Sequence, residues 1–430
     1  MSPGRAPRRR PLLLFAGLLA PALLLLGALV AYPILYTLAR SLFDRTGDQF
    51  VGLANYREIV ERPATLAALR NNLVWAVLAP SLTTALGCLL AILTERIRWQ
   101  TAFRLILFLP MAISLLSAGI MWRLVYEQDP GRGLANALLR AAASLVQPPG
   151  PYPGARPSQP DRLAREGHGF RSTRAYGPGE TAAFGLVAIP PRLVPAGAAP
   201  ARPAAAAPGA IRGVVWLDFT RGGRGERGRL DPAEVGLPGV RVAALAGGQP
   251  VAEAVTGEDG TFELGPIPAG GVQLALAEAS FRPPFAGFAW LGRDLVTPAI
   301  ILAYVWMWTG FAVMVIAAGL AAIPREALEA AKVDGAGEWR VLRHVTLPLL
   351  APALAVVFVT LLINVLKIFD LVLVIAPGSV QADATVIALE VWRAAFGARD
   401  HGLGSALAVV LFLLVLPPVL LNLRRLRSRT

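Results

Sequence analysis

The sequence predicts an all-α polytopic membrane protein with six transmembrane helices and a small all-β sandwich inserted between the third and the fourth. Of its 430 residues, 55% are hydrophobic and 16% are charged, whereas soluble domains average about 45–50% apolar and about 25% charged residues. Six apolar runs reach the roughly 20 residues that a bilayer-spanning helix needs. Between the third and fourth runs, short β-branched segments alternate with Gly, Pro and Asp turns. This composition excludes an ordinary soluble enzyme.

The first span follows an arginine-rich start and carries no charge over its length. A secretory signal has an apolar core of only about 7–15 residues, so we expect this longer run to stay in the membrane as a helix. The six predicted spans are 12–38, 73–93, 103–126, 295–323, 347–375 and 405–423.

The basic residues predict the orientation of the spans, because Lys and Arg concentrate in cytoplasmic loops. With the N-terminus in the cytoplasm, fifteen of them fall in inner segments and seven in outer short loops. Both termini are therefore expected in the cytoplasm, and the segment between spans three and four outside it. The net charge of +13 is spread over short clusters rather than one patch, which argues against a nucleic-acid partner and for the lipid membrane as the partner.

The segment between spans three and four is expected to have two parts, which separate the membrane segments 1–126 and 281–430. Residues 127–210 read as a Pro/Gly-rich linker, with 13 prolines within 147–210, a composition that buries too little surface to fold. Only 182–189 has the apolar pattern of a strand. Residues 211–280 read as a β-sandwich, because alternating runs are broken by Asp-Gly and Pro-Gly turns.

Three segments of this sandwich resemble the collagen-adhesin B-type repeat, a small prealbumin-like domain of surface proteins. They are Gly236–Val240, Thr256–Phe262 and Ile267–Gly270. Many such repeats contain a Lys–Asn isopeptide bond, but residues 211–277 hold neither lysine nor asparagine. The resemblance therefore implies a sandwich without that cross-link.

The loop 322–347, between the fourth and fifth spans, predicts a helix, a glycine turn and a second helix. Pro324 suits the first turn of a helix, and the helix formers of Ala327–Val333 follow it. Gly335 can adopt the left-handed conformation that ends a helix. A basic, amphipathic stretch, Glu338–Val345, comes next, and Pro348 begins the following span. Without further information, this pattern is also that of a helix lying in the membrane interface.

The same loop resembles the signature of binding-protein-dependent ABC importer permeases. That signature has Glu-Ala-Ala, then a glycine, then a hydrophobic residue shortly before Leu-Pro, and here these are Glu329-Ala330-Ala331, Gly335, Val345 and Leu347-Pro348. Phe50–Tyr56 after the first span is similar to a motif of the sugar permeases. Residues 363–370 and 402–410 are similar to the maltose-type partner, especially its α-glucoside branch.

This resemblance implies a type I importer permease in a bacterial cytoplasmic membrane, forming half of the pathway of an ATP-driven carbohydrate importer. The implied partners are a second permease subunit, ABC ATPase subunits, an extracytoplasmic solute-binding protein and the sugar substrate. The implied ATPase-coupling residues are Glu329, Ala330, Ala331, Asp334, Gly335 and Pro348. The sequence has no Gly-x-x-x-x-Gly-Lys-Ser/Thr loop, so ATP and Mg²⁺ are expected on the partner ATPase and no cofactor on this chain.

Three polar residues of the fifth predicted span, Asn364, Lys367 and Asp370, recur every third position and would share one helix face. Polar residues within spans often mark transport pathways, so this face either lines the sugar pathway or holds a structural Lys367–Asp370 pair or the second permease. One cysteine, Cys88, and three distant histidines offer no metal site. No catalytic constellation is present either, so we expect a protein that is not an enzyme.

Two other classes of protein compete with this interpretation. A membrane-anchored adhesion or display protein would explain 211–280 but not the loop signature at Glu329–Pro348. A secondary transporter would explain six spans, but it predicts internal hydropathy repeats and more carboxylates within the spans than this sequence has.

Overall fold

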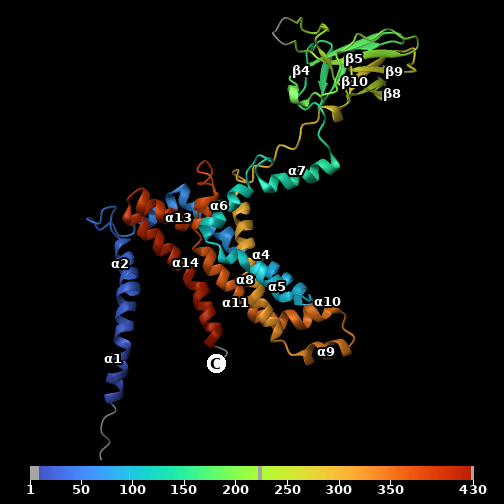
Figure 1. Cartoon of the computed structure of the whole chain (residues 1–430). Helices are drawn as coiled ribbons and strands as arrows, with labels where there is room; N and C mark the ends of the chain where they lie inside the picture. The colour runs from blue at the N-terminus through green and yellow to red at the C-terminus, as the bar shows by residue number, and fades with distance from the viewer. Residues whose placement is uncertain (1–8, 96, 221–224, 428–430) are drawn as a thin grey trace, which may run out of the picture. The chain divides into compact units, whose positions relative to one another are not determined.

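The computed structural model describes residues 9–95, 97–220 and 225–427 (Figure 1). The chain forms two compact units. The membrane unit comprises the chain up to residue 126 and from residue 289 onward, and the insert unit comprises residues 127–288. Four arginines that count toward the expected orientation, Arg5, Arg8, Arg96 and Arg429, lie outside the described residues.

Apart from one isolated β-bridge between Phe43 and Phe50, the described residues of the membrane unit form helices. They are α1 (Arg9–Leu26), a π turn (Gly27–Ala31), α2 (Tyr32–Arg40), α3 (Ala54–Glu61), α4 (Pro63–Glu95), α5 (Gln100–Phe108), a 3₁₀ turn (Leu109–Ala112), α6 (Leu115–Val125), α8 (Val296–Ala321), α9 (Arg325–Val333), α10 (Glu338–Val341), a π turn (Leu342–Thr346), α11 (Leu347–Leu366), α12 (Asp370–Ile375), α13 (Ile387–Trp392), a π turn (Arg393–Gly397) and α14 (His401–Arg427).

Five helices of the described residues are long and apolar enough to cross a membrane, and a sixth crossing exists if one bent pair counts as a span. The five are Leu18–Arg40, Pro63–Glu95, Val296–Ala321, Glu338–Leu366 and His401–Leu420.

The third predicted span is not one straight helix, which corrects the expectation for 103–126. Gln100–Ala112 and Leu115–Val125 meet at an angle of 99°. Pro110 lacks the N–H that would continue the helix, and the Ser114 hydroxyl caps α6 by accepting a hydrogen bond from the Ser117 N–H at 3.2 Å. The proline therefore ends the helix before the break, and the serine cap starts the helix after it.

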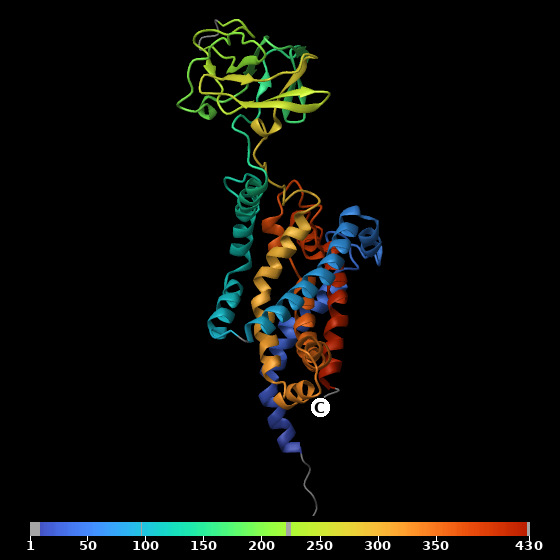
Figure 2. The same cartoon turned by 90° about the vertical axis from the view of Figure 1, so that its right-hand side faces the viewer.

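Helices α4 and α8 pack closely because small residues meet at their interface (Figure 2). A β-carbon on Gly87 of α4 would overlap Ala312 of α8. A β-carbon on Gly310 of α8 would overlap the backbone of α5 at Leu107, so α8 also packs closely against α5. Small residues of this kind let helix backbones approach in a membrane. Trp75 of α4 and Tyr304 of α8, both buried, add an edge-to-face contact with ring centroids 5.7 Å apart.

The sugar-permease-like segment Phe50–Tyr56 fastens the end of α2. The buried Asn55 side chain donates hydrogen bonds to the carbonyls of Ser41 and Phe43, each at 2.8 Å, and the Tyr56 hydroxyl lies 2.7 Å from that of Ser41. A β-carbon on Gly402 would overlap the Phe43 carbonyl. The two motifs that the sequence analysis singled out, around residues 50–56 and 402–410, thus meet at one end of the membrane unit.

The insert unit contains helix α7 (Leu134–Val146) and two five-stranded sheets. Its strands are β1 (Arg156–Pro157), β2 (Leu163–Glu166), β3 (Gly169–Tyr176), β4 (Thr181–Val187), β5 (Ile211–Leu217), β6 (Val235–Gly236), β7 (Arg241–Ala246), β8 (Gln249–Val255), β9 (Thr261–Leu264) and β10 (Val272–Leu276). One sheet has the order β1-β4-β5-β6, with β9 also paired to β5, and the other has the order β2-β3-β10-β7-β8.

The sheets begin 55 residues before the predicted sandwich, so the expectation of a linker over 127–210 is wrong. Strand β4 confirms the strand expected at 182–189 and pairs in parallel with β5, from Thr181 opposite Arg212 to Leu186 opposite Leu217. Phe170, Phe184 and other apolar side chains of this segment are buried in the core that both sheets share. The proline content suggested a linker. The segment is folded nevertheless, because it packs against β5 and β10, which supply the apolar surface that it lacks alone. The likeness to collagen-adhesin repeats stays a prediction.

We expect Gly236→Ala to destabilise the insert. Gly236 lies opposite Trp216 in the sheet, and a β-carbon there would overlap the Asp259 and Gly260 backbone. Forcing atoms into such a site costs on the order of 1–3 kcal/mol. Limited proteolysis of the full chain, scored by cleavage within 127–288, measures the loss. Gly270→Ala is the matched control, because nothing lies within 4 Å of its β-carbon position. Equal resistance of the two variants would contradict the packing described here.

Candidate functional site

Helix α9 and the turn after it form the helix and glycine turn that the sequence predicts. Pro324 precedes α9 in an extended conformation (φ −60°, ψ 130°), and Glu326 lies in the first turn, where a negative charge favours the helix dipole. At the other end, Gly335 adopts φ +77°. The Gly335 N–H donates to the Lys332 carbonyl and the Ala336 N–H to the Ala331 carbonyl, each at 3.0 Å. This pair of bonds is a Schellman motif.

The second helix of the loop does not stop before the span. Glu338–Leu366 is one helix of 29 residues, which corrects the expectation that Pro348 begins a separate element. A π turn at Leu342–Thr346 lies directly before Pro348, where the missing proline N–H would otherwise interrupt the hydrogen bonds of the helix. The loop is therefore mechanically continuous with the span that follows it.

The coupling residues proposed from the sequence are open to solvent. Glu329, Ala330, Asp334, Gly335 and Pro348 are exposed and Ala331 is half-buried. Two apolar side chains beside them, Val333 and Trp339, are 87% and 71% exposed. Lys332 and Glu338 bridge the turn at 3.6 Å, a surface pair that adds little stability. The loop thus presents an amphipathic, uncovered helix.

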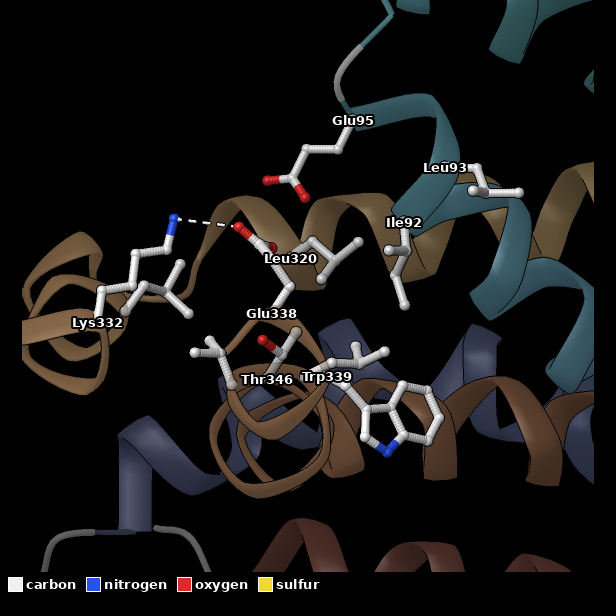
Figure 3. Close-up of a pocket in the computed structure, with 11 residues that line it drawn as sticks. Ile92, Leu93, Glu95, Leu320, Lys332, Glu338, Trp339 and Thr346 are labelled. Carbon is white, nitrogen blue, oxygen red and sulfur yellow. Dashed lines mark ion pairs between the residues drawn. The ribbon is translucent and has the colours of Figure 1, made fainter. Parts of the chain in front are cut away.

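A pocket of about 640 Å³ lies behind α9, within the membrane unit. Figure 3 shows side chains from the ends of α4 and α8, from α9 and from the helix that follows converging on it. Its lining is Ile92, Leu93, Glu95, Leu320, Leu328, Lys332, Glu338, Trp339, Val341, Leu342 and Thr346. Helix α9 contributes Leu328 and Lys332, one helical turn apart, to this lining, so the side of α9 that carries these two residues faces the pocket.

The three polar residues of the fifth predicted span do not share one helix face, which corrects that expectation. Helix α11 ends at Leu366, and α12 begins at Asp370. Asn364 is half-buried in α11, whereas Lys367 and Asp370 are exposed on either side of the break. Lys367 and Asp370, both in the described part of the chain, form no ion pair with each other. Lys367 lines a separate hollow of about 290 Å³ together with Val391 and Phe412.

The break after α11 is held by two asparagines of α4 that the sequence analysis missed. Asn72, 2% exposed, donates to the Leu366 carbonyl at 3.3 Å and accepts from the Ile387 N–H at 2.8 Å. Asn71, 3% exposed, donates to the carbonyls of Asp383 and Thr385, each at 2.8 Å. The predicted second span began at Leu73 and so excluded both residues. Helix α4 begins ten residues earlier, and two adjacent amides in an apolar helix are the signal that could have found them.

A polar network continues from the segment that Asn71 holds. Arg393 donates to the Glu390 carboxylate at 2.8 Å and to the Gln381 side-chain carbonyl at 2.7 Å. The Thr385 hydroxyl donates to the same Glu390 carboxylate at 2.7 Å. Because the Glu390 side chain is only 13% exposed, the attraction between Arg393 and Glu390 is stronger than that of an ion pair in open solvent. The break is thus surrounded by fixed polar groups.

Comparison with known proteins relates the chain to membrane transport proteins. Residues 246–426 match the family described as binding-protein-dependent transport system inner membrane component. The chain is 26% identical over 410 residues to the osmoprotective compounds uptake permease protein GgtC of Synechocystis, covering 95% of this chain and 97% of that one. It is 26% identical over 406 residues to the alpha-glucoside transport system permease protein AglF of Rhizobium meliloti, covering 94% and 80%.

The fold also has a counterpart among solved structures. A chain of the bacterial alginate ABC transporter, in complex with an alginate pentasaccharide-bound periplasmic protein, superposes with a TM-score of 0.54 at 16% identity, covering 95% of the permease and 93% of that chain. The likeness to this chain concerns the fold, whereas the two relatives named above are permease proteins, which are not enzymes.

We expect Asn72→Ala to destabilise the permease. The substitution leaves the Leu366 carbonyl and the Ile387 N–H buried without a partner, and each such loss costs about 1–3 kcal/mol. Asn71→Ala should act in the same direction. Thermal unfolding of the full chain in lipid nanodiscs measures the effect. Ser81→Ala, on the exposed side of the same helix, where the hydroxyl bonds only to Val77 of its own helix, should change little. Indistinguishable unfolding of all three variants would show that the asparagines do not hold the break.

Proposed function

We propose that the permease forms half of the membrane pathway of an ATP-driven carbohydrate importer and is coupled to a separate ATPase through the loop that contains α9. The observation that carries the proposal is an uncovered helix, fastened by Gly335 to a helix long enough to span the membrane. A push on such a helix is passed to the span through this turn, which two backbone hydrogen bonds close.

The exposed side of α9 suits a protein partner. Glu329 offers a carboxylate to a basic residue, and the side chain of Ala330 is only a methyl group, which lets a partner approach closely. Val333 at the end of α9 and Trp339 of α10 supply apolar area, and exposed tryptophans often dominate binding energy at interfaces. The sequence lacks a phosphate-binding Gly-x-x-x-x-Gly-Lys-Ser/Thr loop, so the ATP and Mg²⁺ are assigned to the partner subunit.

A carbohydrate substrate is supported by the relatives. AglF is named for alpha-glucosides, and the superposed transporter chain belongs to a system that imports alginate. An oligosaccharide of the α-glucoside type is our specific proposal. Broken helices in membranes persist where their free backbone groups face a cavity or protein, so we place the pathway at the break beside Lys367, with Asn364 and Asp370 at its two ends.

The other components follow from the same family. A solute-binding protein outside the membrane is supported by the complex in which the alginate transporter was solved. A second permease subunit would complete the pathway, and the first helix, of which no residue in Leu18–Arg40 is buried within the bundle, leaves room for it. We propose a cytoplasmic membrane location with both termini in the cytoplasm and the insert on the opposite side.

The proposed coupling predicts that Glu329→Lys and Gly335→Pro separate the ATPase from the permease. Loss of a charge-assisted hydrogen bond costs about 1.5–3 kcal/mol, or roughly a 10- to 100-fold weaker complex. Proline at 335 cannot adopt φ +77° and removes the N–H that closes the turn. Co-purification of the ATPase with the membrane complex, and sugar uptake by cells, measure both effects.

Two control variants test whether the effect is specific to α9. Gly337→Pro keeps the turn, because Gly337 already has φ −66° and nothing lies within 4 Å of its β-carbon position. Glu253→Lys makes the same charge change on an exposed position of strand β8. Both controls should retain the ATPase. Retention of the ATPase by Glu329→Lys and Gly335→Pro as well would refute docking through α9.

A further inference from the structure

Helix α7 of the insert unit has an apolar side that nothing in the described chain covers. Leu134, Leu138 and Leu145 lie one, and then nearly two, helical turns apart and so share one side. They are 57%, 63% and 87% exposed. The opposite side carries Asn136, Arg140 and Ser144, and α7 holds no acidic residue. A helix with one apolar side, a polar side and a lone positive charge has the pattern of helices that lie in a membrane interface.

The first turn of α7 is tied to both ends of the insert by one buried side chain. The Asn136 amide donates to the carbonyls of Glu127, Gln128 and Phe288 at 3.0, 3.2 and 3.0 Å, and its oxygen accepts from the Phe288 N–H at 2.8 Å. A glycine allows the two ends of the insert to come this close, since a β-carbon on Gly287 would overlap the Gln128 carbonyl. The first turn of α7 is therefore held against the two ends of the insert unit.

These tied residues adjoin the membrane-spanning segments. Glu127 directly follows Tyr126, the C-cap residue of α6, and Phe288 precedes the start of α8 at Val296 by eight residues. Trp122, Tyr126 and Trp290 form an aromatic cluster there, with centroids 5.1 and 5.8 Å apart along it. Such aromatic residues gather at the membrane–water boundary. Lipid is thus the apolar phase that the chain itself brings next to α7.

We propose that α7 lies along the bilayer interface, with Leu134, Leu138 and Leu145 among the lipid acyl chains. Arg140 and Ser144 then lie away from the acyl chains, where they line a hollow of the insert unit together with Glu278 and Arg282. The two segments that lead to the sheets would then leave from a helix held at the membrane surface rather than from free loops. This inference does not depend on the transported substrate or on the ATPase.

Fluorescence quenching in nanodiscs tests the orientation. The full chain with Cys88→Ala carries one new cysteine, Leu138→Cys or the matched control Ser144→Cys, labelled with an environment-sensitive dye. We expect the dye at 138 to emit at shorter wavelength and to lose several-fold more intensity to a nitroxide on the lipid acyl chain than the dye at 144. The dye at 144 should be quenched by iodide in solution.

Two results would overturn the proposal. Equal iodide quenching at both positions would place α7 in water, and a dye at 138 that resists both iodide and the lipid nitroxide would place another protein on this side.

A second experiment covers the case in which the label itself disturbs the helix. The dye is placed at Ala141→Cys. The double variant Leu138→Glu with Leu145→Glu should then lose the lipid quenching, whereas Ser144→Glu should keep it. Unchanged lipid quenching in the double variant would also contradict the proposal.

Discussion

The left-handed turn at Gly335 is the constraint on which the coupling end of the permease depends. It closes α9 with two backbone hydrogen bonds and directs the chain at once into a helix that continues to Leu366. For a residue with a β-carbon, this conformation costs roughly 1–2 kcal/mol, so glycine is the natural occupant. Because only Ala336 and Gly337 separate Gly335 from the helix that begins at Glu338, we propose that α9 and its span move together as one lever.

The opposite end of that lever is a break that the bilayer would not tolerate without protein partners. Unpaired backbone groups are costly in an apolar medium, and Asn72 supplies partners to Leu366 and Ile387 from a neighbouring helix. Asn71 does the same for the segment before α13. The span is thus stiff where we place the ATPase and interrupted where we place the sugar, which is the distribution of rigidity that an alternating pathway requires.

The sequence was most informative where a structure depends on neighbouring residues. The ends of α9 could be predicted, because Pro324 and Gly335 act within a single turn. The break after Leu366 could not, since it depends on Asn72, which lies 294 positions away in the chain. A regular spacing of Asn364, Lys367 and Asp370 therefore suggested a continuous face that does not exist. The early strands of the insert were missed for a similar reason: β4 is stabilised by its parallel partner β5 and by a shared core, neither of which a proline count reveals.

The most direct test of the lever is a pair of distances measured by electron paramagnetic resonance in the complete transporter, without nucleotide and with nucleotide trapped. Labels at Arg325 and Leu349, both exposed, report on α9 and the span that it joins, and labels at Arg325 and Leu93 report on α9 against α4. The account predicts that the 325–349 distance stays constant while the 325–93 distance changes. A 325–349 distance that shifts or broadens when nucleotide is trapped would show that the Gly335 turn bends, and would contradict it.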